Sequence, residues 1–299
     1  MSSFGSAWHR WFASAGGSTL NDVELEGLLF RYQCRLERLP DALKERFVQL
    51  GRDRALSEYL ERVRHARHGR IMTALHHALR AYLSDFDING ILGTYPMHVL
   101  GTEQWRFLLE PLLAQDQNGC LLDVGAGNGD VTSALSPLFA RTLTTETSRA
   151  MAWRLRRRGF TCQHVDLAEA SAEGGPFDAI ACLNVLDRCD RPLTLLGNLR
   201  AQLKNRGLLI IALVLPYQPF VYAGATSRDP TERLALSADS WEASVGELCS
   251  RVLVPLGLTI ESVSRVPYLS GGDARHPIYE LDDVVVVCRA IGRALVVSV

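Results

Sequence analysis

The stretch LLDVGAGNGD, residues 121–130, decides the fold class of this 299-residue chain. It begins as an apolar run, and Gly125, Gly127 and Gly129 then alternate with other residues. Glycine lets the backbone turn sharply and lets a ligand lie close against it. The spacing is G-x-G-x-G, which differs from the G-x-G-x-x-G of many dinucleotide sites. The stretch therefore predicts a buried strand, a tight ligand-binding turn and then a helix.

The chain on the carboxyl side of this turn alternates between strand and helix patterns. We expect strands at 120–124, 142–146, 163–166, 177–183 and 208–215, and helices at about 130–139, 149–158 and 193–203. After a polar insert we expect a helix near 241–254 and two strands at 258–265 and 284–289. Alternation of this kind is typical of a parallel sheet covered on both faces. The predicted fold class is therefore α/β, with a Rossmann-like sheet in a domain spanning 115–299.

The residues before the sheet, 1–114, have a helical pattern. Apolar residues recur at helical spacing at Leu56, Leu60 and Val63, and again at Leu75, Leu79 and Leu83. Residues 87–101 are rich in Gly and Pro and predict a connector or lid, after which Thr102 should cap a short helix. We expect this α-helical N-terminal region to form part of the site.

Composition limits the classes of partner. The formal net charge is -1, so the overall excess of positive charge typical of nucleic-acid binding is missing. No apolar run approaches the roughly 20 residues of a membrane span. The 7 cysteines form no C-x-x-C pair, which indicates a reducing compartment and no metal site. We expect a cytoplasmic monomer; the acid-free N-terminus leaves organelle targeting as the alternative.

Polar residues follow the predicted strands where parallel sheets bind ligands. Glu146 closes the second predicted strand, and its carboxylate would accept hydrogen bonds from two ribose hydroxyls. Asp166 closes the third and would meet an adenine amino group. At the end of the fourth, the stretch CLNVLDRC, residues 182–189, places Asn184 and Asp187 three positions apart. The plain alternative is that this pair only forms a turn.

The order of Asp123, the three glycines and Glu146 resembles the first motif of class I S-adenosylmethionine-dependent methyltransferases. The resemblance implies a loop packed on the methionine part of the cofactor, an acid on the ribose and a last strand that is antiparallel. A nicotinamide-dependent dehydrogenase is the alternative, and the glycine spacing counts against it. The candidate cofactor-binding residues are Asp123, Gly125, Gly127, Asn128, Glu146, Asp166 and Asn184.

Several longer segments are similar to the methyltransferase-like protein 9 family. They are DINGILG, LLDVGAGNGDVT, CLNVLDRCDRPLTLL, ALVLPYQPFV, RVPYLSGGD and YELDDVVVV, within residues 85 to 289. The family methylates protein histidines at the pros (Nδ1) nitrogen, preferably in H-x-H sequences with a small middle residue. By resemblance, Asn184 and Asp187 contact the target imidazole, Tyr268 and Tyr279 line its pocket, and Tyr217 is a further substrate-binding candidate. Tyr268 and Tyr279 could equally be packing aromatics.

Elementary chemistry gives Asp187 a role. Neutral imidazole has one N–H and one lone pair, and its ordinary pKa of about 6.5 keeps it mostly neutral at pH 7. A carboxylate that accepts from Nε2–H leaves the Nδ1 lone pair free to attack a methyl group, while Asn184 holds the ring or the cofactor. The same carboxylate favours imidazolium, which cannot attack, so the site must limit that shift or lose the proton on binding.

Two other functions remain open from the sequence. The chain could methylate another amine or a small molecule, or it could bind S-adenosylmethionine as a scaffold without catalysing transfer. None of its 8 histidines lies in an H-x-H sequence. We therefore predict no efficient self-methylation of the preferred kind.

Overall fold

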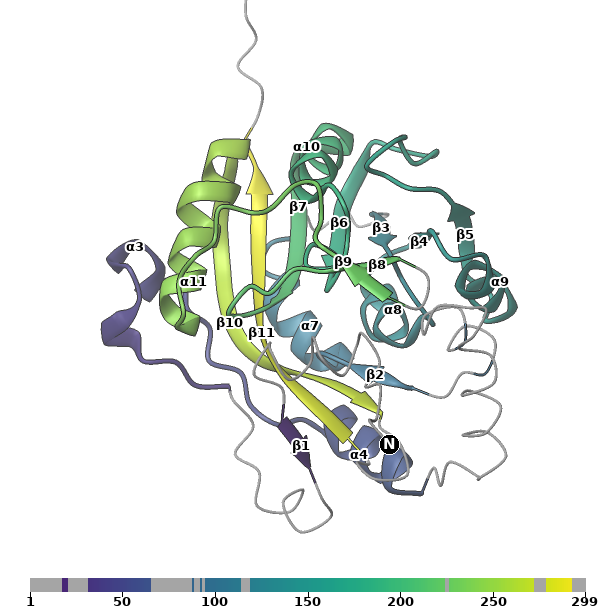
Figure 1. The fold of residues 1–299 in the computed structure, drawn as a ribbon, viewed down its shortest axis with the longest axis horizontal. Helices are drawn as coiled ribbons and strands as arrows, with labels where there is room; N and C mark the ends of the chain where they lie inside the picture. The colour runs from purple at the N-terminus through teal and green to yellow at the C-terminus, as the bar shows by residue number, and fades with distance from the viewer. Residues whose placement is uncertain are drawn as a thin grey trace, which may run out of the picture.

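The computed structural model describes residues 18–20, 32–65, 88, 92, 95–113, 119–223, 226–271 and 278–291. Within them, one nine-stranded sheet has the order β2-β10-β11-β7-β6-β3-β4-β5, with β1 beside β11. Figure 1 shows this sheet twisting through the molecule, with α10 and α11 in front of its strands. No helix in these residues is long and apolar enough to cross a membrane.

One half of the sheet is parallel. Its strands are β3 (Cys120–Val124), β4 (Arg141–Glu146), β5 (Thr161–His164), β6 (Phe177–Leu183) and β7 (Leu203–Val214). The connecting helices are α8 (Asp130–Leu135), α9 (Arg149–Arg157) and α10 (Pro192–Gln202). All four strand pairs in this half are parallel. Their carboxyl ends therefore meet at one edge, where the polar residues follow.

The last two long strands complete the sheet. They are β10 (Leu258–Gly271) and β11 (Ile278–Ala290). Strand β11 lies between β7 and β10 and runs antiparallel to both, so β10 runs in the same direction as β7. This confirms the predicted α/β fold class, a mostly parallel sheet whose last strand is antiparallel.

The N-terminal region adds to the same sheet. Strand β1 (Ser18–Leu20) pairs with β11, and β2 (Met97–His98) pairs with β10. The region also contains η1 (Leu36–Arg38), α3 (Asp41–Lys44), α4 (Arg54–His65) and α7 (Thr102–Leu109). The α4 residues Leu56, Leu60 and Val63 are buried, as their spacing predicts. The second predicted repeat, at Leu75, Leu79 and Leu83, lies outside the described residues.

Several boundaries differ from the predictions. Strand β5 ends at His164, so Asp166 follows the strand rather than closing it. The polar insert contains a small hairpin, β8 (Val221–Ala223) with β9 (Thr226–Arg228). The predicted helix at 241–254 is α11 (Trp241–Glu247) followed by a π-helical turn, η3 (Leu248–Leu253), and a 3₁₀ turn, η4 (Val254–Leu256), that contains a proline. Gly101, not Thr102, precedes the first residue of α7, and its N–H donates to the Gln104 side chain at 3.0 Å.

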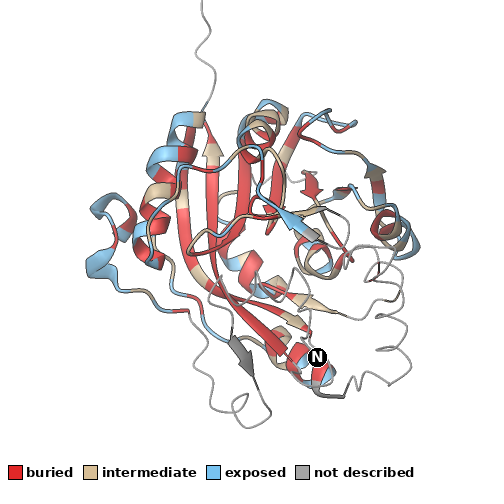
Figure 2. Cartoon of the chain, viewed as in Figure 1, coloured by how far each residue is buried: buried red, intermediate tan, exposed pale blue. Residues whose placement is uncertain are grey.

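The core lies on both faces of the sheet. One apolar cluster joins α4 and α7 to the strands through residues such as Tyr59 and Trp105. The other joins α10 and α11 to the opposite face, through Leu196 and Trp241 among others. Figure 2 shows the central strands buried along most of their length. Because both faces of the sheet are covered, a ligand can bind only at the edge formed by the strand ends.

Candidate active site

The glycine turn between β3 and α8 has the conformation that its sequence predicts. Gly125 and Gly127 have φ of +63° and +57°, a left-handed region that other residues rarely adopt. A Cβ at Gly125 would lie 2.8 Å from Cγ2 of Val185, in the loop after β6. A Cβ at Gly127 would lie 3.4 Å from Cε of Met97. The turn therefore lies directly against the β6 loop and against β2.

Glu146, the last residue of β4, binds the glycine turn through its carboxylate. Its Oε2 accepts from the Gly127 N–H at 3.0 Å, and its Oε1 accepts from the N–H groups of Thr147 and Ser148 at 2.8 and 3.0 Å. Burial raises the pKa of Glu146, and these backbone N–H groups oppose the rise. The carboxylate thus lies beside the turn, already oriented by three donors.

Asp123 and Asn128 face the protein rather than an open space. The Asp123 carboxylate is 2% exposed and accepts from the Thr132 hydroxyl at 2.6 Å, which ties β3 to α8. Burial raises the pKa of Asp123 to about 7. The Asn128 amide donates to Asp130 at 2.7 Å. Asp166 is different, because it is exposed and accepts from the N–H of Ala168 at 2.8 Å.

Asn184 follows β6 in a left-handed conformation, with φ of 55°. Its amide nitrogen donates to both carboxylate oxygens of Asp283 in β11, at 2.9 and 2.8 Å. Both side chains are buried. Asp283 was not among the predicted site residues. The only sequence signal for it is a carboxylate inside the apolar run LDDVVVV, residues 281–287.

Asp187 is 1% exposed, and within the described residues neither of its carboxylate oxygens has a hydrogen-bond partner. Its nearest opposite charge is Nε of Arg188, 3.5 Å from Oδ2. Burial raises the pKa of Asp187, and the charge of Arg188 together with weak polar contacts from the Asp187 N–H and the Arg188 side chain, all too long or too bent for hydrogen bonds, opposes that rise. A buried carboxylate without donors is costly, so it commonly marks a place where a ligand completes the hydrogen bonds. Arg188 was also not predicted as a site residue.

The three tyrosines lie in two groups. Tyr268 is buried, its hydroxyl donates to Sδ of Met97 at 3.1 Å, and Arg188 lies 5.4 Å above its ring. In the β10–β11 register Tyr268 opposes Leu281 and Tyr279 opposes Ser270, so both tyrosines are on one face. Tyr217 packs against the opposite core cluster, and its hydroxyl lies 3.4 Å from the carbonyl of Leu186. Burial raises the pKa of Tyr217, with a further contribution from Asp187.

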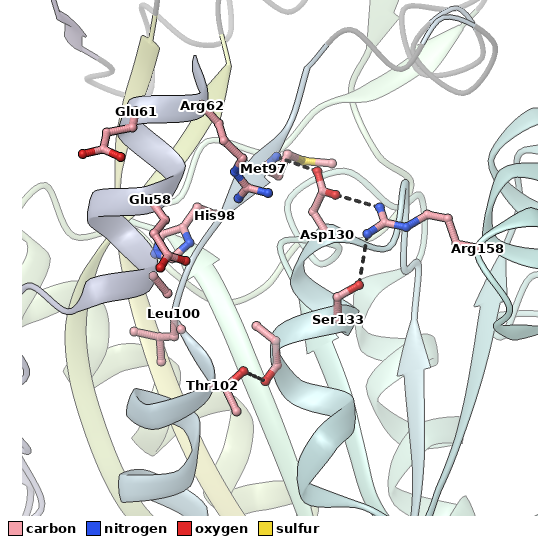
Figure 3. Close-up of a pocket in the computed structure, with 13 residues that line it drawn as sticks. Glu58, Glu61, Arg62, Met97, His98, Leu100, Thr102, Asp130, Ser133 and Arg158 are labelled. Atoms are coloured by element: carbon pink, nitrogen blue, oxygen red, sulfur yellow. Dashed lines mark hydrogen bonds and ion pairs between the residues drawn. The ribbon is translucent and has the colours of Figure 1, made fainter. Parts of the chain in front are cut away.

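A cavity of about 690 Å³ lies between α4, β2 and α8 (Figure 3). It adjoins the glycine turn through Asp130, whose carboxylate accepts from the Met97 N–H at 3.1 Å and from Arg158 at 2.7 Å. Its wall from α4 carries Glu58, Glu61 and Arg62. The lining combines α4, β2, α8 and Arg158, which are far apart in the sequence, and this is why no motif predicted the cavity.

His98 in β2 also lines this cavity. It is 8% exposed and stacks on Tyr59 with ring centroids 5.3 Å apart. Burial lowers its pKa to about 4, and the charge of Arg62 adds to the effect. The ring is therefore neutral at pH 7.

The strand order, the glycine turn on β3 and the buried acid on β4 define a class I S-adenosylmethionine-dependent methyltransferase. The sequence model of the DREV methyltransferase family matches residues 31–290. The chain therefore belongs to that family. S-adenosylmethionine is its cofactor, and the residues present fit it, since the two left-handed glycines keep the turn free of side chains and the buried carboxylate of Glu146 lies beside them.

Several solved structures of methyltransferases have a similar fold. The N-methyltransferase NodS from Bradyrhizobium japonicum WM9, with S-adenosylhomocysteine, is 17% identical over 63% of this chain and 86% of its own, with a TM-score of 0.40. A putative methyltransferase from Bacillus halodurans C-125 is 12% identical over 64% and 100%, with a TM-score of 0.44. The magnesium protoporphyrin IX methyltransferase from Synechocystis PCC 6803, with bound S-adenosylmethionine, is 13% identical over 73% and 96%, with a TM-score of 0.42. At such values they carry no argument about the substrate of this chain.

Proposed function

We propose that this protein transfers the methyl group of S-adenosylmethionine to the pros (Nδ1) nitrogen of histidine in H-x-H sequences of other proteins. The observation that carries the proposal is Asp187. It is a buried carboxylate without a hydrogen-bond partner in the described residues, on a loop that touches the glycine turn through Val185. A neutral imidazole supplies the N–H donor that such a group lacks.

The cofactor would lie along the strand ends. Its sulfonium supplies an electrophilic methyl group. In this proposal the turn at Gly125 and Gly127 takes the methionine part, Glu146 the ribose and Asp166 the adenine, whose exposed carboxylate has room for an amino group. Asp123 and Asn128 act one step back, because their hydrogen bonds to Thr132 and Asp130 hold the turn in shape.

Arg188 answers the difficulty that a carboxylate beside imidazole favours the unreactive imidazolium. Its guanidinium lies 3.5 Å from Asp187 and offsets part of that negative charge. Asp187 can then accept from Nε2–H and select the tautomer without strongly raising the pKa of the ring. As positive charge develops on the ring during transfer, the carboxylate stabilises it.

The N-terminal region would help to roof the target pocket. Met97 joins three parts of the site, because it touches the position of Gly127, accepts from Tyr268 and donates its N–H to Asp130. The cavity behind it has room for residues that flank a target histidine. We propose that a monomer is sufficient, which size-exclusion chromatography with light scattering would test.

The deciding experiment is incubation with labelled S-adenosylmethionine and peptides containing HAH, HAA, AAH or AAA. We expect label on HAH well above the single-histidine peptides, and none on AAA. Amino-acid analysis of the product separates pros from tele methylhistidine. Absence of label from every histidine peptide would contradict the proposal and point to another amine or a small molecule as the acceptor.

A further inference from the structure

Asn184 is fixed at one end of its side chain. Its amide nitrogen lies within 2.9 Å of both oxygens of Asp283, and its backbone N–H donates to the carbonyl of Ala212 at 2.9 Å. Carboxylate oxygens accept hydrogen bonds, and an amide nitrogen only donates them. The contact therefore orients the amide, with the nitrogen toward β11.

The amide oxygen is then the end of Asn184 that a ligand can use. Asp283 is fully buried in β11, opposite Val214 of β7, so it cannot move aside to let the amide turn. Burial raises the pKa of Asp283 well above its ordinary value. A protonated Asp283 would still accept from the amide nitrogen through its carbonyl oxygen.

We propose that Asp283 is a positioning residue that fixes Asn184 as a hydrogen-bond acceptor for an N–H group bound beside the glycine turn. The inference rests on the proposed function for the source of that group, which is either the α-ammonium of the methyl donor or the Nε2–H of the target histidine, which Asn184 would then share with Asp187. The left-handed backbone of Asn184 agrees with this role, because strained conformations cluster where a side chain must be aimed.

An exchange of the two side chains tests the inference. In N184D/D283N the new amide at 283 donates to the new carboxylate at 184, whose second oxygen still faces the ligand. In D283N alone two amides meet, and Asn184 is free to turn its nitrogen outward. In N184D alone two buried carboxylates repel each other.

We expect D283N and N184D each to lose about tenfold or more in methyl transfer, as for a lost hydrogen bond to a charged group. We expect the exchanged pair to recover to within about threefold of the wild type. A merely structural pair would regain thermal stability in the double variant but not transfer, and that result would overturn the inference. D283E, which keeps the carboxylate, serves if D283N does not fold.

Asp282 provides the matched control. It is a buried carboxylate on the same strand, but it binds Arg265 at 2.9 Å rather than Asn184. D282N should lower stability with transfer within about threefold of the wild type. The source of the N–H group then follows from two parameters in D283N. Weaker S-adenosylmethionine binding assigns the α-ammonium, whereas unchanged binding with lower kcat and a smaller pros fraction assigns the ring.

Nuclear magnetic resonance separates this inference from the proposed function. With ¹⁵N-asparagine labelling, the Asn184 NH₂ signals are assigned by their loss in N184A. We expect them to move in D283E and D283N and to stay in D282N. Signals that stay in all three variants would overturn the inferred contact, whether or not histidine is methylated. Failure of the wild type on every histidine peptide would instead defeat the proposed function alone.

Discussion

Two buried carboxylates in the site, Glu146 at the end of β4 and Asp187 after β6, have opposite surroundings. Glu146 accepts from three backbone N–H groups, whereas Asp187 accepts from none in the described residues and lies 3.5 Å from one arginine. Hydrogen bonds that the fold supplies hold a group ready before any ligand arrives. A carboxylate left without them depends on a ligand for its donor. In the proposed function, the fold thus completes the cofactor side of the site, and the substrate completes the acceptor side.

We expect the largest effect from a substitution in the glycine turn, on the cofactor side of the site. A valine at position 125 would have to adopt a left-handed backbone conformation, which β-branched residues rarely do. Its Cβ would also collide with the side chain of Val185. We expect G125V to weaken S-adenosylmethionine binding by about 1000-fold, about 4 kcal/mol, and transfer to fall with it. Isothermal titration calorimetry measures the affinity. G159V is the matched control, because Gly159 has φ of +90° with no atom within 4 Å of an added Cβ. Wild-type affinity in G125V would mean that the turn does not contact the cofactor.

We expect the next largest effect on the acceptor side of the site, at Asp187. We expect D187N to lower kcat on the HAH peptide by about 100-fold, because an amide selects the ring tautomer less well and stabilises the developing charge less. Affinity for S-adenosylmethionine should stay within about threefold. D190N is the control, since Asp190 is in the same loop but binds Arg228 at the surface. Equal kcat in D187N and D190N would remove Asp187 from the proposed mechanism.

These two sides also differ in how far the sequence predicts them. The turn and Glu146 form from residues close together in the chain, so the order of strand, glycines, helix and acid was enough to place them. Asn184 and Asp187 were placed beside them because parallel strands end at one edge. Asp283 was out of reach, because it meets Asn184 only through the pairing of β7 with β11, and the two are 99 positions apart.

The strand boundaries show the same limit. Strands β10 and β11 are longer than predicted because their extensions, 266–271 and 278–283, pair with each other. The extensions also pair with β2 and β1, strands of two and three residues whose patterns are too short to detect. Pro267 and Tyr268 therefore lie within a strand that the sequence predicted to end at Arg265. The arginine beside Asp187 was visible in the sequence, but its role depends on a geometry that sequence alone does not show.

A smaller effect is expected at Glu146. In E146Q the NH₂ group of the new amide would face backbone N–H groups, which also donate, so hydrogen bonds that hold the glycine turn in place would be lost. We expect about tenfold weaker S-adenosylmethionine binding with kcat at saturating cofactor within about threefold of the wild type. E169Q, at an exposed glutamate paired with Arg191, is the control. A fall in kcat that saturating cofactor does not restore would show that the carboxylate also acts in the transfer step.

The smallest effect compares one buried titratable group from each region, Asp123 from the parallel half and His98 from β2. The folded pKa of Asp123 is raised to about 7, and that of His98 is lowered to about 4. Between about pH 4 and 6.5, folded Asp123 keeps a proton that the unfolded state has lost, and folded His98 lacks one that the unfolded state holds. Asp123 therefore makes the free energy of unfolding fall as pH rises through this window, His98 makes it rise, and the two contributions cancel.

Removing either group should reveal the pH dependence that the other contributes to the free energy of unfolding. In D123N the free energy of unfolding should rise with pH between 4.5 and 6.5 by about 1.4 kcal/mol per pH unit more steeply than in the wild type. In H98Q it should become less steep by about the same amount, and the double variant should follow the wild type. Urea unfolding without cofactor at several pH values measures the slopes. A D123N slope equal to that of the wild type would mean that Asp123 is ionised in the folded protein at pH 4.5. The bond to Thr132 would then join a charge to a hydroxyl, and β3 would bring a second carboxylate, besides Glu146, to the cofactor side.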